Sequence, residues 1–303
     1  MEDNDQIIKG IVVALKANYF IVEIKNDYKR LDIKNRSIKL LCTKRNKLSY
    51  EGSFVSVGDL VVLDAVDWNA STAVIKSIEP RKSFINRPAL SNFTHVFVVL
   101  SLENPKFERT QATRFLLKAE ETEQQISLII TKSDLIDQKL LKQNICRFKE
   151  WGYEAIAISI VSGFGIDQLF KKLDTVNLGI LCGPSGVGKS SLVKYLLPKK
   201  KISIGSLSKK LQRGRHTTRH VELFSLSNGH FLADTPGFNK PDLTINAEIL
   251  PRLFPEIRLQ LENYRCKFRD CLHLDEPGCA ISRDWERYQD YKNFLQDIIR
   301  SHQ

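Results

Sequence analysis

The stretch that decides the fold is Gly183-Pro184-Ser185-Gly186-Val187-Gly188-Lys189-Ser190, which matches the phosphate-binding pattern GxxxxGK[ST] in full. The apolar run Leu178–Cys182 precedes it and a helical pattern at 191–197 follows it, which is the strand–loop–helix context that the motif requires. Glycines let the loop N–H groups point at phosphates, and the helix N-terminus adds a positive dipole end. We expect Lys189 to reach the β- and γ-phosphates of a nucleotide, Ser190 to ligate Mg²⁺, and the contacts to extend to Ser191. The alternative, a glycine-rich turn without a ligand, is disfavoured by this context.

Two segments after the loop carry further candidates for the magnesium shell. Asp234-Thr235-Pro236-Gly237 follows a strand-like stretch at 229–233, which puts a carboxylate at a strand end and the Gly237 N–H near a γ-phosphate. Between the two lies Gly214-Arg215-His216-Thr217-Thr218-Arg219. Either Thr217 or Thr218 can complete the Mg²⁺ shell, and the sequence does not choose between them. The alternative for this segment is a solvent-exposed basic loop.

A base-reading motif, Thr131-Lys132-Ser133-Asp134, comes directly after the apolar run 126–130. It therefore lies at the C-terminal end of a predicted parallel strand, where such sheets bind ligands. In the pattern [NT]KxD the carboxylate accepts hydrogen bonds from guanine N1–H and the 2-amino group, which adenine cannot offer. An exposed turn is the alternative for a bare tetrapeptide. Ser159, at the end of the predicted strand 154–159, fits a segment that backs the base.

The pattern around these motifs alternates between strand and helix. Apolar runs at 96–100, 126–130, 154–159 and 178–182 alternate with helical spacing at 109–120, 140–151 and 166–173. This alternation predicts an α/β domain with helices on both faces of a mostly parallel sheet. Residues 7–80 instead contain about five short strands, at 7–13, 19–24, 38–42, 61–65 and 74–78, which predict a small closed barrel, OB-like or SH3-like. Residues 79–88 are the expected linker.

The net charge of +11 is concentrated in two places. Residues 194–220 hold nine Lys or Arg and no acidic residue, and residues 27–47 hold eight against two, so the rest of the chain is net negative. Such clusters favour a polyanionic partner such as nucleic acid over the alternative of solvated loops. The acidic start MEDNDQ lacks the apolar stretch of a secretory signal, and no apolar run reaches the roughly 18 residues of a membrane span. We expect a cytoplasmic monomer.

Three of the six cysteines crowd together near the C-terminus, close to a histidine. Cys266, Cys271, His273 and Cys279 supply three thiolates and one imidazole within fourteen residues, a closed tetrahedral set for one structural Zn²⁺. Individually, each of these residues could be an ordinary buried cysteine or surface histidine. We predict three domains: an OB-like barrel (1–82), an α/β P-loop GTPase domain (83–240) and a small α-helical zinc-binding domain (241–303). The apolar stripe at 285–298 is expected to pack in a core.

The motifs run in a rotated order, with the base-reading motif before the phosphate loop. Rotation leaves spatial neighbours unchanged when the original termini lie close together, so the site can still form. The chain resembles the circularly permuted RsgA (YjeQ) family of ribosome-assembly GTPases through TKSD before GPSGVGKS, GRHTT, DTPGF and CKFRDCLHLDEPGC. The resemblance covers nearly the whole chain and implies an OB-fold barrel and slow GTP hydrolysis to GDP that the small (30S) ribosomal subunit stimulates. It also implies a role in late maturation of that subunit, with its rRNA as partner. Arg219 departs from the family, which commonly continues with a third Thr.

The catalytic group is not evident from the motifs. Ras-like GTPases orient the attacking water with a Gln just after DxxG, and Phe238 occupies that position here. His216 is the candidate because an imidazole can orient or accept a proton from water, and its alternative role is contact with RNA or solvent. Because the basic cluster 194–220 runs into the Thr segment, we also predict that GTP and GDP give different RNA affinities.

Other classes of protein remain as alternatives. A P-loop ATPase or small-molecule kinase is opposed by the base-reading motif, and a pure RNA-binding module is opposed by Lys189, Ser190 and Asp234. A GTPase acting on another RNA partner is the runner-up, because the residues alone do not separate the 30S subunit from other RNA.

Overall fold

The computed structural model describes residues 7–16, 19–24, 38–45, 54–86, 88–197, 221–226, 229–234 and 245–301. The chain forms two compact units that interleave along the sequence. The first unit takes its residues from 1–95, 171–181 and 190–237, and the second from 96–170, 182–189 and 238–303. Residues 183–189 of the phosphate loop and the base-reading motif therefore belong to the same unit. None of the helices in the described ranges is both long and apolar enough to span a membrane.

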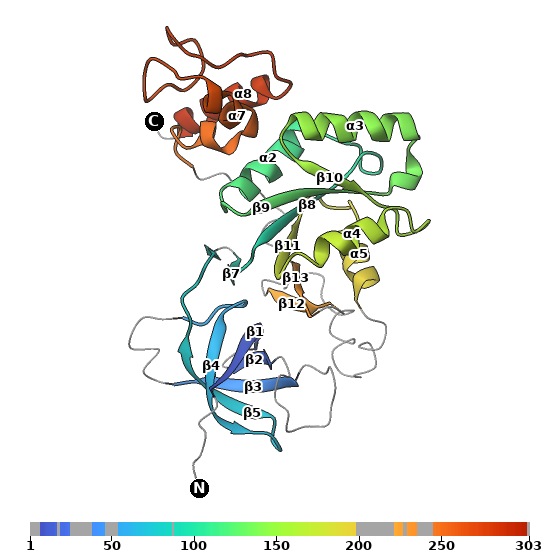
Figure 1. The fold of residues 1–303 in the computed structure, drawn as a ribbon, viewed down its shortest axis with the longest axis vertical. Coiled ribbons are helices and arrows are strands. Elements are labelled where there is room, and N and C mark those ends of the chain that lie inside the picture. Colours follow the sequence, from blue (N-terminus) through green and yellow to red (C-terminus); the bar gives the residue numbers. More distant parts are fainter. Residues whose placement is uncertain are drawn as a thin grey trace. The chain divides into compact units, whose positions relative to one another are not determined.

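Five strands of the first unit close into a barrel: β1 (Ile8–Lys16), β2 (Tyr19–Ile24), β3 (Ile38–Lys44), β4 (Leu60–Asp67) and β5 (Thr72–Ile78) (Figure 1). They pair in the order β1-β2-β3-β5-β4, and β4 returns to pair with β1. The β3–β5 pair is parallel, and the other pairs are antiparallel. Alternate residues point inward, so Val12, Val22, Leu40, Val61 and Ile75 form the barrel core. This closed five-stranded order is that of an OB-fold, which confirms the predicted OB-like barrel.

The segment after the barrel is attached to it by an ion pair whose carboxylate is buried. The Asp59 carboxylate is fully buried and accepts hydrogen bonds from Arg81 Nε at 2.7 Å and Arg81 Nη2 at 2.9 Å. The Arg81 guanidinium lies 4.7 Å from the ring centre of Phe54 and 4.6 Å from that of Phe84. The predicted linker is therefore fixed at its start. A hairpin of β6 (Phe84–Asn86) and β7 (Ala89–Ser91) follows.

Three further strands of the chain are short: β11 (Leu178–Cys182), β12 (Glu222–Ser225) and β13 (Phe231–Asp234). β11 pairs with β13 in parallel, and β12 pairs with β13 antiparallel. The predicted mostly parallel sheet thus includes an antiparallel strand. The β11–β13 pairing puts the backbone of Asp234 opposite Leu181, which lies two residues before the phosphate loop.

The second unit contains β8 (His95–Ser101), β9 (Gln125–Thr131) and β10 (Glu154–Ala157), in the order β10-β9-β8 with β9 and β10 parallel. Its helical elements are α2 (Arg109–Glu120), η1 (Ser133–Leu135) and α3 (Gln138–Glu150), followed by α4 (Ile166–Leu173) and α5 (Lys189–Leu196), which extend beyond it. The three strands and the helices α2, α3, α4 and α5 match the predicted ones, with ends that differ by a few residues, whereas η1 was not predicted. The same unit also contains three helical elements near the C-terminus: η4 (Leu250–Leu253), α7 (Pro255–Asn263) and α8 (Tyr288–Ser301).

The C-terminal helices share one apolar core. Tyr291, Phe294, Leu295 and Ile298 of α8 are buried in it, as the helical stripe predicted. Leu117 of α2 is part of the same core, so the C-terminal helices dock directly on the α/β part of the unit. The predicted domain boundaries after residues 82 and 240 stay a prediction.

Candidate functional site

The glycines of the phosphate loop adopt positive φ angles, a backbone conformation that glycine allows. Gly183, Gly186 and Gly188 have φ angles of 141°, 82° and 99°. A Cβ atom on Gly183 would lie 2.0 Å from the Val99 carbonyl oxygen, so only glycine fits there. Lys189 is buried, and its Nζ donates to the carbonyl oxygens of Gly183 at 2.6 Å and Pro184 at 2.7 Å. The ammonium group is therefore held against the loop, as a phosphate-binding role requires.

The base-reading motif contacts the phosphate loop directly. The Thr131 hydroxyl donates to the Val187 carbonyl oxygen at 2.5 Å, and it lies 3.1 Å from the Leu100 carbonyl oxygen. Lys132 has a left-handed backbone (φ 55°), and its Nζ donates to the Gly186 carbonyl oxygen at 2.8 Å. The same ammonium group donates to the Asn104 carbonyl oxygen at 2.5 Å. Two motifs more than fifty residues apart are thus joined by hydrogen bonds.

The loop after β10 lies beside the base-reading motif. The Ser133 N–H donates to the Ile158 carbonyl oxygen at 3.2 Å, while the Asp134 side chain is exposed. Ser159 is fully buried, and its hydroxyl accepts hydrogen bonds from the N–H groups of Val161 and Ser162. The Ser159 hydroxyl therefore shapes the loop beside the base-reading motif, and its role in backing the base stays a prediction.

Two residues that help to form this site, Gly165 and Asn104, were not predicted from the sequence. A Cβ atom on Gly165 would lie 1.9 Å from the Ala157 carbonyl oxygen, so this glycine lets the loop pack on β10. The closely spaced glycines of Gly163-Phe164-Gly165 after a predicted strand could have indicated it. Asn104 takes part only through its backbone carbonyl, so no pattern of residue types could have indicated it.

The structure describes only some of the remaining candidate residues for magnesium, GTP and catalysis. Ser190 and Ser191 are exposed in the first turn of α5, and the backbone of Asp234 ends β13. His216, Thr217, Thr218 and Gly237 lie outside the described residues.

The predicted metal-ligating residues come together. The ligand atoms of Cys266, Cys271, His273 and Cys279 all lie within 4.8 Å of one another. The sulfur atoms of Cys266 and Cys279 lie 3.5 and 3.6 Å from His273 Nδ1. Tetrahedral zinc with ordinary bond lengths holds sulfur and nitrogen ligands about 3.6 Å apart. The donor set and its spacing therefore fit one metal ion.

Burial shifts the pKa of Cys271 and of His273. It raises the pKa of the Cys271 thiol to about 12 and lowers the pKa of His273. A neutral imidazole suits metal binding, whereas a thiolate at Cys271 needs a cation beside it. The Glu276 carboxylate accepts from the N–H groups of Leu272 and Leu274, both at 2.8 Å, so it shapes the loop that carries two of the ligands.

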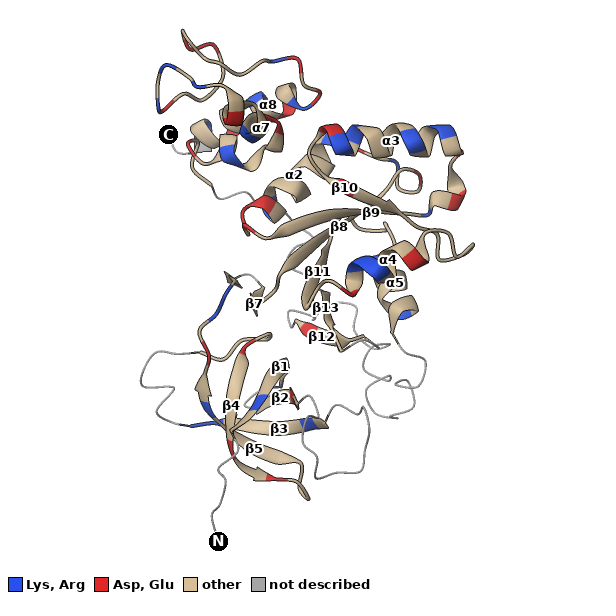
Figure 2. Ribbon diagram, in the orientation of Figure 1, with Lys and Arg blue, Asp and Glu red and all other residues tan. Residues whose placement is uncertain are grey.

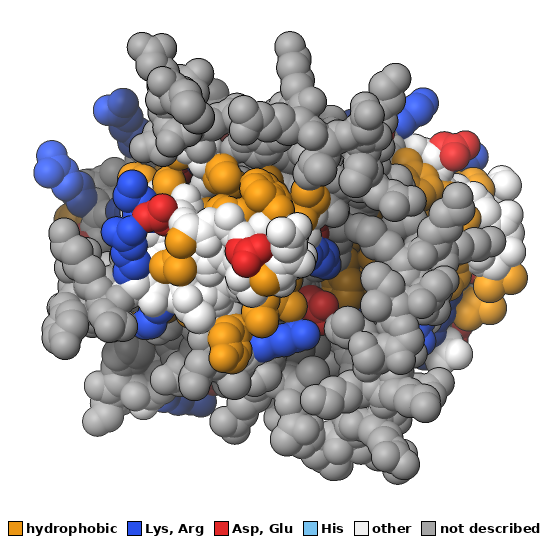
Figure 3. Space-filling model, turned by 90° about the horizontal axis from the view of Figure 1, so that it is seen from below, with side chains coloured by type: hydrophobic (Ala, Val, Ile, Leu, Met, Phe, Trp, Pro, Cys, Tyr) orange, Lys and Arg blue, Asp and Glu red, His pale blue; other side chains and the backbone are white. Residues whose placement is uncertain are grey.

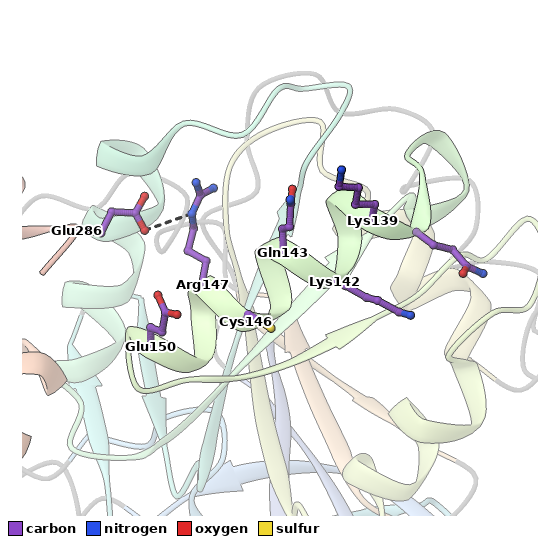
Figure 4. A pocket seen from close by; sticks show the side chains of 8 residues that line it. Lys139, Lys142, Gln143, Cys146, Arg147, Glu150 and Glu286 are labelled. Carbon is purple, nitrogen blue, oxygen red and sulfur yellow. Dashed lines mark ion pairs between the residues drawn. The ribbon is translucent and has the colours of Figure 1, made fainter.

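Few residues of the two predicted basic clusters lie on the described surface, because most of 27–47 and 194–220 lies outside the described residues. Lys and Arg occur along α3, and a groove on this helix is lined by Lys139, Lys142, Gln143, Cys146, Arg147, Glu150 and Glu286 (Figures 2 and 4). On the face seen from below, hydrophobic side chains lie among basic and acidic ones (Figure 3).

Comparisons with known proteins agree with this geometry. The sequence profile of the RsgA GTPase family matches residues 78–244. "Small ribosomal subunit biogenesis GTPase RsgA" of Prochlorococcus marinus is 55% identical, covering 100% of this chain and 99% of that protein. The crystal structure of YloQ, described as a circularly permuted GTPase, has a TM-score of 0.77 at 26% identity and covers 99% of this chain and 98% of its own. YjeQ from Thermotoga maritima also gives 0.77 at 26% identity, covering 97% and 99%. The chain therefore belongs to the RsgA family of circularly permuted GTPases.

Proposed function

We propose that this GTPase binds guanine nucleotides between the phosphate loop and the base-reading motif, and that Asp134 selects guanine. The observation that carries the proposal is the pair of hydrogen bonds from Thr131 and Lys132 to the phosphate loop. They hold the exposed Asp134 at a fixed place relative to Lys189, which suits a ligand with a base at one end and phosphates at the other. Gly183 to Ser191, Ser159 and Gly237 complete the proposed contacts with GTP.

The reaction we assign is hydrolysis of GTP to GDP and phosphate. Ser190 and Asp234 would ligate Mg²⁺, with Thr217 or Thr218 joining them when the γ-phosphate is present. Magnesium would neutralise the charge that develops on the phosphates. His216 remains the proposed catalytic group, because Phe238 stands where a glutamine would orient water.

The metal we assign to the three cysteines and His273 is a single structural zinc ion. Four protein ligands close the coordination shell, so this site leaves no position for a substrate or an activated water. Its role is to hold the loop at 266–279 against the C-terminal helices, which Tyr288 and Tyr291 also do by donating hydrogen bonds to carbonyl oxygens of that loop.

The process we assign is late maturation of the small (30S) ribosomal subunit, with rRNA contact, by a cytoplasmic monomer. The names of the relatives and the two basic clusters at 27–47 and 194–220 support it. The test is GTP turnover with and without purified small subunits, with free RNA as the control. We expect stimulation by subunits only. Equal stimulation by free RNA would favour a GTPase that acts on another RNA.

A further inference from the structure

One carboxylate near the C-terminus contacts the start of a helix that lies far away in the sequence. Asp290, in the first turn of α8, is 2% exposed. Its carboxylate accepts hydrogen bonds from Arg109 Nε at 2.6 Å and from the Thr110 hydroxyl at 2.7 Å. These two residues lie 181 and 180 positions earlier in the sequence. Arg109 and Thr110 are the first two residues of α2.

Helix α2 lacks the usual local means of fixing its start. Its N-cap residue Glu108 makes no side-chain capping hydrogen bond, and its first turn contains no acidic residue. A carboxylate near the positive end of a helix stabilises it. Asp290 therefore ties the first turn of α2 to α8 through the Arg109 and Thr110 side chains.

The segment just before α2 borders the nucleotide site. The Asn104 carbonyl oxygen receives the Lys132 ammonium group, which also contacts Gly186 of the phosphate loop. Pro105, Phe107 and Glu108 line a small cavity together with phosphate-loop residues Pro184 and Val187. A shift of this segment would move the carbonyl that holds Lys132.

A second contact from the C-terminal part reaches the same segment. The Phe107 ring packs edge-on against Phe148 at 5.6 Å and lies 6.2 Å from the Trp151 ring. Trp151 Nε1 donates to Glu286 at 3.0 Å, and Glu286 also pairs with Arg147 at 3.2 Å (Figure 4). The C-terminal end of the segment at 102–108 is thus supported by Asp290, through Arg109 and Thr110, and by Glu286, through Trp151 and Arg147.

We propose that Asp290 is a positioning residue for guanine-nucleotide binding. By anchoring the start of α2, it fixes the segment at 102–108 and with it the Lys132 ammonium group between Asn104 and the phosphate loop. The C-terminal part of the chain then sets how long the nucleotide stays bound. This inference rests on the proposed function, because it requires the base-reading motif to hold a guanine nucleotide.

The test measures dissociation of a fluorescent GDP analogue from the full-length protein and compares Asp290→Asn with Asp275→Asn. Asp275 is the matched control because it pairs with Arg283 in the same part of the chain, and its side chain is 78% exposed. We expect Asp290→Asn to raise the dissociation rate constant about tenfold, equivalent to about 1.4 kcal/mol. Asp275→Asn leaves it unchanged. In Asp290→Asn the KM for GTP is expected to rise, whereas kcat stays within about twofold of the wild-type value. The reason is that the contact acts on binding rather than on the reacting phosphate.

The outcomes distinguish a failure of the proposed nucleotide binding from a failure of the positioning role of Asp290. Failure of the wild-type protein to bind GDP would overturn the proposed function itself. Wild-type binding with equal dissociation from both variants would overturn only the positioning role, even if Asp290→Asn lowered the melting temperature. If Asp290→Asn does not fold, Thr110→Val decides, because it removes one hydrogen bond to Asp290 at nearly constant volume. Dissociation from that variant at the wild-type rate would also overturn the proposal.

Discussion

The buried ion pair between Glu256 and Arg287 gives a sharp prediction about stability. The Arg287 side chain is fully buried, and its Nε and Nη2 donate to the two carboxylate oxygens of Glu256 at 2.7 and 2.6 Å. Its guanidinium also lies over the rings of Trp151 and Phe254, at 4.7 and 5.0 Å from their centres. Substituting Glu256→Gln keeps the shape but leaves a buried cation without its anion.

The expected loss in the free energy of unfolding is about 3–5 kcal/mol, the usual cost of removing one partner of a buried pair. At roughly 2–4 °C per kcal/mol, the melting temperature falls by about 10 °C. The assay is urea unfolding at 25 °C followed by tryptophan fluorescence, since Trp151 contacts Arg287 directly. The urea midpoint shifts while the slope of the transition stays the same.

Two further variants test whether the loss of stability comes from the unpaired buried charge. Asp275→Asn removes an exposed ion pair with Arg283 and is expected to cost less than about 1 kcal/mol. The double variant Glu256→Leu, Arg287→Met replaces the buried pair by apolar side chains and is expected to recover most of the loss. The reasoning fails if Glu256→Gln costs no more than Asp275→Asn, or if the double variant is as unstable as the single one.

Asp134→Asn is expected to weaken GDP binding at least about 100-fold and to favour xanthosine diphosphate, whose C2 carbonyl accepts from an amide; competition binding with unchanged preference would contradict this. Lys189→Ala is expected to abolish measurable GTP binding by calorimetry, since it removes the buried ammonium group of the phosphate loop. His216→Ala is expected to lower subunit-stimulated GTP turnover about 100-fold, and an unchanged rate would rule out its catalytic role. Cys271→Ser is expected to reduce bound zinc, measured by elemental analysis, and to lower the melting temperature; full zinc content would argue against the assigned ligand set.

The parts of the site that the sequence predicts are those in which a local pattern carries the chemistry. The phosphate loop, the base-reading motif and the four metal-ligating residues each lie within one short stretch, and the structure brings the described ones together as expected. Contacts between distant segments were not predictable. Asp290 pairs with residues 180 positions away, and Arg287 pairs with Glu256 across 31 positions, with no motif to link either pair.

Residue type also does not predict some details of the backbone. The Ser159 hydroxyl accepts two backbone N–H groups of its own loop, and this arrangement depends on the path of the backbone at the two nearby glycines. In the C-terminal stripe, spacing alone could predict burial but not that Leu117 of α2 would share the core.

The position of α8 has a consequence for synthesis of the protein. Phosphate loop, base-reading motif and C-terminal helices belong to one compact unit, and the last described helix completes its core. A chain still emerging from its translating ribosome would carry both nucleotide motifs while Leu117 and the start of α2 lacked their partners. Domains fold as units once their sequence is available. Nucleotide binding would therefore be acquired late in translation, so an incomplete chain would not compete for GTP.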